Sequence, residues 1–480
     1  MNEKNGAKKI LTAGVGYILG GILIKGIAFI TTPIFSRLMT TEEFGQLNTY
    51  LSYESILAML IGFQFAGCLK NAKIKYADIS GGLDTFFSNL IALLLLHSAA
   101  ALVLVNVFSG IIMHLTGIRS LLLLNLLVLN CFGNAAMTVY NSFVSLNYQY
   151  KKYVAISVFN ALANVALSLL LIFTALSGDK SMARILGYVL PYVFISLYLI
   201  VSSFHKSKPK LHSPEKYNVF AYRFCAPLIP NGFAEVMLTQ FGKLSVDRYC
   251  GAATMGVYSL AYNVYSIVAT VKLGMDYIVG PFYFDKRAVE DYSGLRKTFF
   301  IYSRSLAMIS TLIMLFSPEI IRILGDQPYY DARLSAIPLI AVSYFSFLCY
   351  MLSQEEYFMQ KTYLVSVISV IAMVFNIVLC TVFVPQFEAM GAAFSTLISF
   401  VIMFLMHFIA IKGVLKSQSF YWKGLLVDGV FVTIMSIVAI MIADHLLPRV
   451  VLIIAMLAAT IIFACKYFKQ LVQLKKTNAP

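Results

Sequence analysis

Apolar stretches of about 20 residues recur along the whole chain, and each is long enough to cross about 30 Å of hydrocarbon as a helix. Apolar residues make up 60% of the 480 residues and charged residues only 12%. Soluble domains contain roughly 45–50% and 25% of these classes. Because lipid offers backbone groups no water to bond, each span must satisfy them internally as a helix. The sequence therefore predicts an all-α polytopic membrane protein.

Fourteen apolar ranges are predicted to span the membrane. They cover residues 10–32, 46–69, 84–108, 120–145, 153–176, 182–204, 218–242, 253–281, 298–317, 334–354, 362–384, 389–411, 423–444 and 448–467. About two thirds of the 37 Lys and Arg residues fall in the termini and in the alternate loops on the same side, which is the pattern of cytoplasmic segments. We therefore expect both termini in the cytoplasm. The net charge of +15 is explained by this topology and by contact with anionic lipids, and we expect no nucleic-acid partner.

The loops between these ranges are short and carry no recognisable catalytic motif. No Gly-rich phosphate loop, His/carboxylate cluster or Ser/His/Asp arrangement lies outside the spans. The seven cysteines form no CxxC pair, so we interpret them as small buried hydrophobic residues and expect no metal site. A membrane enzyme would normally present a catalytic loop. The pattern therefore favours a transporter over an enzyme.

Ionisable side chains inside the spans are costly in hydrocarbon and mark candidate transport pathways. The basic ones are Lys25, Arg223, Lys272 and Arg304, and the acidic ones that stand out are Glu54, Glu235 and Asp276. For Arg223 and Arg304, which lie near the predicted inner surface, snorkelling is the competing explanation. Lys25 and Glu54 lie at similar predicted depths when each residue adds 1.5 Å. We therefore expect these two side chains to face a shared interior.

Range 253–281 carries one polar stripe at helical spacing. Its members are Tyr258, Tyr262, Tyr265, Ala269, Lys272 and Asp276. Asparagines recur in the two ranges that cover 120–176, at Asn130, Asn134, Asn141, Asn160 and Asn164. Such tyrosines commonly pack or form interfacial belts, and such asparagines commonly join helices. The sharper interpretation is a wet cavity, in which aromatic faces stack on sugars, amides bond hydroxyls and cations hold phosphate.

Two stretches 211 residues apart indicate an internal repeat. Residues 36–47 read SRLMTTEEFGQL, and residues 247–258 read DRYCGAATMGVY. Arg37 and Gly45 in the first stretch correspond to Arg248 and Gly256 in the second. Both stretches follow an odd-numbered span on the predicted outer side. We therefore expect two six-helix bundles of the same orientation, related as a parallel repeat.

The repeat divides the chain into four predicted parts. These are an N-lobe at 1–205, a basic cytoplasmic linker at 206–217, a C-lobe at 218–411, and two extra helices with a cytoplasmic tail at 412–480. The offset carries Lys25 to position 236, next to Glu235. Our hypothesis for that pair is a charge lock between the lobes in one conformation.

The two repeat stretches resemble a known family. Residues 35–50, FSRLMTTEEFGQLNTY, are similar to the segment after the first helix in polysaccharide (O-antigen- and capsule-type) flippases. Residues 245–264, SVDRYCGAATMGVYSLAYNV, resemble the hallmark after their seventh helix, which is a polar residue, Asp-Arg and a run of the Gly-Tyr-Ser-x-Ala type. These flippases belong to the multidrug/oligosaccharidyl-lipid/polysaccharide exporter superfamily. The helix pattern extends the resemblance over most of the chain.

The resemblance implies two lobes around a central cavity. It implies that the chain flips an undecaprenyl-diphosphate-linked oligosaccharide from the cytoplasmic to the outer leaflet of the bacterial cytoplasmic membrane, for surface polysaccharide biosynthesis. The implied partners are membrane lipids, a polysaccharide polymerase and glycosyltransferases. No cofactor is expected beyond a coupling cation, for which Na⁺ and H⁺ both stay open. Many relatives have twelve helices, whereas a count of fourteen resembles the peptidoglycan-precursor branch and some capsule exporters.

A diphosphate with a sugar head cannot cross hydrocarbon without compensating polar groups. The expected diphosphate ligands are Lys25, Arg248, Lys272, Arg223 and Arg304. The expected sugar ligands are Tyr258, Tyr262, Asn134 and Asn141. The expected coupling and gating residues are Glu54, Glu235, Asp276, Asp247 and Arg37. Two alternatives stay open, a cation-coupled multidrug exporter of the same superfamily and a membrane-embedded polysaccharide polymerase or glycosyltransferase.

Overall fold

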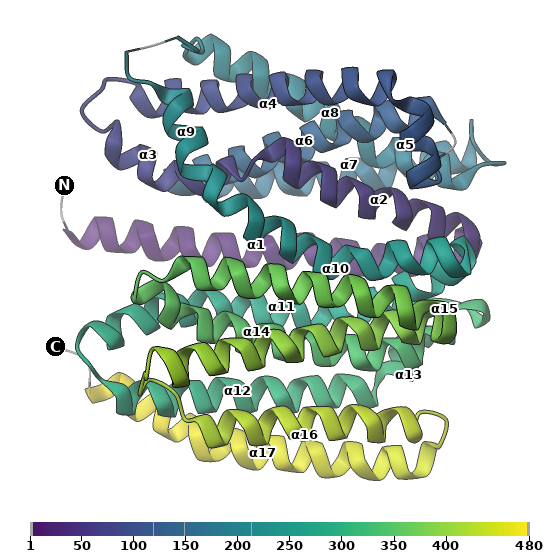
Figure 1. Ribbon diagram of the computed structural model, residues 1–480, viewed down its shortest axis with the longest axis vertical. Helices are drawn as coiled ribbons and strands as arrows, with labels where there is room; N and C mark the ends of the chain where they lie inside the picture. The colour runs from purple at the N-terminus through teal and green to yellow at the C-terminus, as the bar shows by residue number, and fades with distance from the viewer. Residues whose placement is uncertain (1–2, 119, 148, 213, 478–480) are drawn as a thin grey trace. The chain divides into compact units, whose positions relative to one another are not determined.

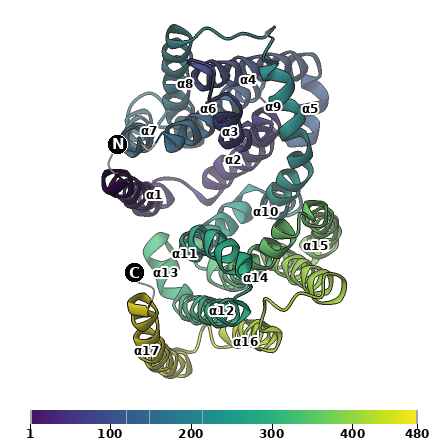
Figure 2. The same ribbon diagram turned by 90° about the vertical axis from the view of Figure 1, so that its left-hand side faces the viewer.

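The computed structural model describes residues 3–118, 120–147, 149–212 and 214–477 (Figure 1). Within these residues the chain forms helices and no strand, and the helices of each part run side by side (Figures 1 and 2). The predicted all-α class is therefore confirmed. Contacts divide the chain into two compact units, Met1–Gly256 and Val257–Pro480.

Unit 1 is built around α6 and holds the following helices: α1 (Glu3–Leu38), α2 (Thr41–Gly62), α3 (Leu69–Lys75), α4 (Gly82–Val107), α5 (Ser109–Thr116), α6 (Leu121–Leu146), α7 (Tyr150–Phe173), α8 (Lys180–Lys206), α9 (Tyr217–Cys225) and α10 (Ile229–Cys250). Helix α6 contacts α2, α4, α7 and α8. Helix α1 packs on α7, where a Cβ on Gly16 would overlap the Tyr150 ring. Small residues thus allow the close approach of two membrane helices.

Unit 2 is built around α14 and holds the following helices: most of α11 (Ala252–Ala288), α12 (Tyr292–Leu315), α13 (Ser317–Leu324), α14 (Ala332–Phe358), α15 (Thr362–Ile409), α16 (Trp422–Met441) and α17 (Leu446–Thr477). In its most apolar stretch α14 is 83% buried, whereas α17 is 17% buried. Helix α14 therefore forms the core of this unit, and α17 presents apolar side chains for lipid to cover.

Each of the fourteen predicted ranges falls mainly on helical residues, with turns at 63–64, 174–176 and 442–444. By length and composition, ten helices in the described residues can cross a membrane, or eleven if the bent segment Thr41–Gly62 plus Phe65–Lys75 is one span. Helix α15 contains two predicted ranges, and its backbone leaves the helical region at Glu388, three residues after Pro385. The chain is thus a multi-pass membrane protein, while the count of fourteen spans stays a prediction.

The units differ from the predicted lobes in the place of two helices, α9 and α10, which together cover the predicted range 218–242. Helix α10 packs against α2 and so belongs to unit 1, although the repeat assigns range 218–242 to the C-lobe. The predicted linker at 206–217 lies between α8 and α9. The lobe boundaries themselves stay a prediction.

Candidate functional site

The two stretches of the repeat each begin a helix in unit 1. Helix α2 starts with a capping box, because the Glu43 amide donates to Thr40 Oγ1 (3.1 Å) and the Thr40 amide donates to Glu43 Oε2 (2.9 Å). The second stretch instead turns at Gly251, whose φ is 85°. Glycine adopts this backbone angle readily, whereas most other residues avoid it. These signals set the first turns of α2 and α11.

Equivalent positions of the repeat touch each other reciprocally. A Cβ added to Gly45 of α2 would lie 2.6 Å from the Ala252 carbonyl carbon, and a Cβ added to Gly256 of α11 would lie 2.9 Å from the Thr41 carbonyl carbon. Thr41 and Ala252 are 211 residues apart, as are the two glycines. All four belong to unit 1. The contact has the self-complementary form of a two-fold interface, which supports the predicted repeat. We call it the glycine crossing.

A buried polar cluster lies between α2 and α6. Glu54 is 3% exposed, and its Oε1 accepts a hydrogen bond of 2.7 Å from Asn134 Nδ2. Neither side-chain polar atom of Asn130 has a partner in the described residues, and the same is true of the Tyr50 hydroxyl. Unpartnered buried polar atoms are costly. The cluster could therefore bind a water or a hydroxyl group.

The predicted shared interior of Lys25 and Glu54 does not take the form of an ion pair. Lys25 is exposed on α1 and forms no ion pair within the described residues, whereas the Glu54 carboxylate is bound to Asn134. An amide on the neighbouring helix is the closer partner, because α2 packs mainly on α6 and α10. Whether Lys25 contacts a substrate is a separate matter, and its role stays a prediction.

Asn164 helps to join α7 to α8 through Arg184. Arg184 of α8 donates to the side chain of Asn164 on α7 and to Ser168 Oγ (2.7 Å), and its guanidinium lies 3.9 Å from the centre of the Phe35 ring. No role was predicted for Arg184 from the sequence. For Asn164 the packing interpretation is therefore the one that the structure supports, whereas Asn141 is half-buried and its Oδ1 has no partner in the described residues.

The predicted stripe on α11 lies on one side of the helix in unit 2. The Tyr258 and Tyr262 rings are 5.3 Å apart, and the next pair, Tyr262 and Tyr265, is 5.4 Å apart. Lys272 Nζ lies 2.8 Å from Asp276 Oδ2. Tyr258 is fully buried, so in this conformation it packs inside the unit and is closed to a sugar. Lys272 is partly exposed and could exchange its carboxylate partner for a phosphate.

Arg304, the last predicted diphosphate ligand, is held by an acidic residue that the sequence analysis did not single out. Its Nη2 lies 2.5 Å from Oδ1 of Asp428 on α16, and Asp428 is 3% exposed. This pair joins α12 to α16. A single Asp in a span was visible in the sequence, but its partner could be known only from the packing of helices 124 positions apart.

The remaining predicted residues lie near helix ends. Arg37, Arg223, Glu235 and Arg248 are exposed, and Asp247 is half-buried. Asn231 donates to Glu235 (3.3 Å) one turn earlier in α10. No ion pair joins Lys25 to Glu235 in the described residues, and the charge lock stays a hypothesis.

Two further buried pairs in unit 2 were not predicted from the sequence. Glu355 of α14 lies 3.3 Å from Arg287, and its neighbour Glu356 lies 2.9 Å from His407 Nδ1. Both Glu356 and His407 are fully buried. The predicted range ended at residue 354, before both carboxylates, so the span pattern gave no signal for them. In the described residues no group of three His, Cys, Asp or Glu could hold a metal ion.

Comparison with known proteins decides the family. The profile of the polysaccharide biosynthesis protein family matches residues 11–274, more than half of the chain. The chain belongs to this family. The match covers both repeat stretches, the polar cluster of α2 and α6, and the start of α11 with Lys272. The resemblance stated from residues 35–50 and 245–264 is thereby confirmed.

The fold of this family member is shared with solved transporter structures. The lipid II flippase MurJ in an inward closed conformation superposes with a TM-score of 0.71 at 16% identity, over 95% of this chain and 99% of that one. An inward-facing multidrug resistance MATE family transporter of the MOP superfamily gives 0.63 at 14%, over 82% and 95%. A MOP superfamily transporter from Pyrococcus furiosus gives 0.59 at 14%, over 89% and 96%. None of the curated proteins compared with the chain matches it in sequence.

Proposed function

We propose that this protein is a flippase that moves an undecaprenyl-diphosphate-linked oligosaccharide from the cytoplasmic to the outer leaflet by alternating access, for surface polysaccharide biosynthesis. The observation that carries the proposal is the match to the polysaccharide biosynthesis protein family over residues 11–274. A fold like that of the lipid II flippase MurJ supports it.

The glycine crossing is a contact that could open and close during alternating access. It joins the first turns of α2 and α11, at the end that the Lys and Arg distribution assigns to the outside. Glycines allow the two backbones to approach so closely that no side chain separates them. We infer that this contact closes the outer end, and that release of substrate to the outer leaflet requires it to separate.

Lys272 is the best-supported diphosphate ligand of the predicted set. Its partner Asp276 lies one turn away on the same helix, and Tyr350 Oη donates to the Asp276 backbone carbonyl (3.0 Å). An arriving diphosphate carries more charge than one carboxylate, so it would compete for the ammonium. Arg304 is a weaker candidate because Asp428 already holds it. Lys25 and Arg248 are both exposed. They remain candidates for the first and last contacts with the diphosphate during transport.

The polar cluster of Glu54, Asn134 and Asn130 supports a role in sugar binding or coupling. Two amides and a carboxylate offer both donors and acceptors, as sugar hydroxyls require. Glu54 also offers a site for a proton or Na⁺, which are the two coupling cations that the sequence left open. Uptake of ²²Na⁺ and of protons by liposomes that contain Glu54→Gln protein would separate the two.

The decisive experiment uses a strain from which this chain is deleted. The expected result is accumulation of lipid-linked oligosaccharide on the cytoplasmic leaflet and loss of surface polysaccharide, both restored by the wild-type chain but not by Lys272→Met. Leaflet is assigned by the accessibility of the sugar to an impermeant lectin before and after lysis. The proposal would be excluded if the deletion strain presented a normal amount of lipid-linked oligosaccharide on the outer leaflet.

A cation-coupled multidrug exporter is the second candidate. Its support is the likeness to a multidrug resistance MATE family transporter, together with the buried carboxylates of Glu54 and Asp276. The same deletion strain separates the candidates, because drug sensitivity without a change in surface polysaccharide would favour the exporter.

A further inference from the structure

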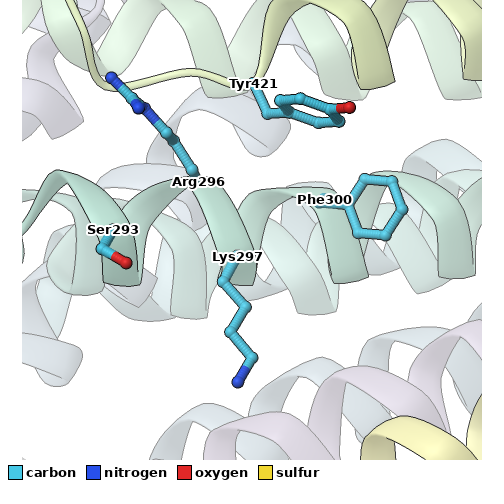
Figure 3. Close-up of a pocket in the computed structure, with 5 residues that line it drawn as sticks. All are labelled: Ser293, Arg296, Lys297, Phe300 and Tyr421. Atoms are coloured by element: carbon cyan, nitrogen blue, oxygen red, sulfur yellow. The ribbon is translucent and has the colours of Figure 1, made fainter.

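A basic cavity of about 370 Å³ lies at one end of unit 2 (Figure 3). It is lined by Ser293, Arg296, Lys297 and Phe300 from the first turns of α12 and by Tyr421, just before α16. Figure 3 shows Arg296 extending from α12 toward the loop above, from which Tyr421 comes, while Lys297 extends to the opposite side of the helix. None of these residues has a part in the transport proposal.

The charge of this cavity is unbalanced. Arg296 donates through Nε to the Gln418 carbonyl (2.7 Å), which leaves its terminal nitrogens for another acceptor. In the described residues neither Arg296 nor Lys297 forms an ion pair with a carboxylate. The nearest acid in sequence, Asp291, is already engaged, because the Gly294 amide and then Lys286 hold the pKa of its carboxyl below the usual value.

A second cavity in unit 2, of about 340 Å³, provides the contrast. Three arginines line it: Arg333 is paired with Asp331 and Asp444, Arg449 is paired with Glu319, and Arg322 lies over the Tyr330 ring. Carboxylates therefore compensate most of the positive charge of this cavity. The cavity at α12 lacks such carboxylates and so attracts an anion from outside.

The walls of the first cavity indicate that the anion belongs to a lipid. Phe300 packs edge-on against Tyr421 (5.9 Å) and Tyr467 of α17 (6.5 Å), and Tyr421 is 48% exposed. From Ser293 to Phe300 the lining changes from polar to aromatic over about 10 Å of helix. This gradient matches the passage from phosphate to acyl chain at a membrane interface, where aromatic belts and basic residues gather.

Gly424 allows Tyr421 and Phe300 to form the aromatic wall of this cavity. A Cβ on Gly424 would overlap the Tyr421 ring and lie 3.1 Å from Phe300. Only a residue without a side chain allows the first turn of α16 to bring Tyr421 beside Phe300. The aromatic wall is therefore set by backbone packing.

We propose that this cavity binds the phosphodiester headgroup of an anionic phospholipid. Arg296 and Lys297 hold the phosphate, Ser293 donates from the positively polarised start of α12, and the aromatic wall receives the glycerol and the upper acyl chain. The Lys and Arg distribution assigns this end to the cytoplasmic leaflet. The proposal does not depend on transport, so lipid binding and flipping can fail separately.

Trp422, the only tryptophan in the chain, gives a direct test. It adjoins Tyr421 and packs on Phe408 (4.9 Å). Full-length protein in detergent is titrated with phosphatidylglycerol or phosphatidylcholine whose acyl chains are brominated, and quenching of Trp422 is followed. We expect phosphatidylglycerol to quench at lower mole fraction. The R296Q/K297Q protein should lose roughly tenfold or more in affinity for it, since each basic residue contributes a several-fold effect.

The matched control is K416Q/K423Q, which removes the same charge from two exposed positions outside the cavity, one in the loop before α16 and one in the first turn of α16. It should keep the phosphatidylglycerol preference. If the control lost as much affinity for phosphatidylglycerol, the effect would come from the general surface potential, and the proposed site would be wrong. So would unchanged quenching in R296Q/K297Q. Inorganic phosphate is the third arm. If millimolar phosphate bound, as judged by a shift of Trp422 emission, and neither lipid was preferred, the ligand would be a soluble anion and the lipid assignment would be wrong.

Discussion

The glycine crossing makes a quantitative prediction for Gly45→Ala and Gly256→Ala. The added Cβ atoms would meet carbonyl carbons at 2.6 and 2.9 Å, whereas carbon atoms in contact lie about 3.5–4.0 Å apart. The helices must therefore separate by about 1 Å. Overpacking of this size costs about 1–3 kcal/mol, of which alanine's better helix propensity offsets up to about 1 kcal/mol. Each variant should lose up to about 3 kcal/mol of unfolding free energy, with about 1–2 kcal/mol in the middle of that range.

The double variant tests whether the two contacts are one structure. Once the first Cβ has pushed α2 and α11 apart, the second Cβ finds space already made. The double variant should therefore lose about as much as one single variant, well short of the sum, as coupled sites do. Unfolding in mixed micelles with increasing SDS, followed by circular dichroism, measures all three variants.

Gly274→Ala is the matched control, because it lies in α11 and a Cβ there would meet no atom within 4 Å. It should be neutral or more stable by up to about 1 kcal/mol. If Gly45→Ala behaved like Gly274→Ala, the close approach would be wrong. If the losses of the two single variants simply added, the contacts would be independent and the two-fold argument would fail. In the transport proposal, the same 1–3 kcal/mol would shift the population away from the closed outer end by roughly 5- to 150-fold.

Three further predictions concern single side chains. Arg304→Gln should cost about 1–3 kcal/mol of unfolding free energy because it leaves the buried Asp428 charge unpaired, and Asp428→Asn in addition should recover much of that loss in the same SDS titration. Asn134→Leu should reduce flipping in the leaflet assay at normal protein level, because the Glu54 carboxylate would lose its 2.7 Å donor, and flipping at the wild-type rate would exclude a role for this pair. Arg248→Lys keeps the charge but loses the two-pronged donor, so a sharp fall in flipping at normal protein level would indicate contact with the diphosphate, while normal flipping would exclude it.

The sequence predicted the membrane class and the helices well, because both depend on local composition. A run of apolar residues must be helical in lipid wherever it lies in the chain, and each predicted range does fall mainly on helical residues. The break between 384 and 389 was equally local, since Pro385 and Glu388 interrupt α15 there. The repeat offset of 211 residues also came from the sequence, through Arg37, Gly45 and their counterparts.

The sequence did not predict which side chains the charged residues of the spans bind. Depth along a span suggested that Lys25 would meet Glu54, but depth gives only one coordinate of a side chain, and its direction around the helix gives the other. Glu54 instead bonds Asn134 because α2 packs on α6. Arg304 meets Asp428 for the same reason, through the packing of α12 on α16.

By itself the sequence determined that this chain is a helical membrane protein of the polysaccharide biosynthesis protein family, and it indicated an internal repeat, because hydropathy, charge bias and short motifs are properties of neighbouring residues. Only the tertiary structure decided that Gly45 and Gly256 meet each other across Thr41 and Ala252, and that the cavity at Arg296 and Lys297 has no carboxylate to neutralise it. Both facts depend on which helices lie side by side. That arrangement is set by the packing of surfaces far apart in the chain.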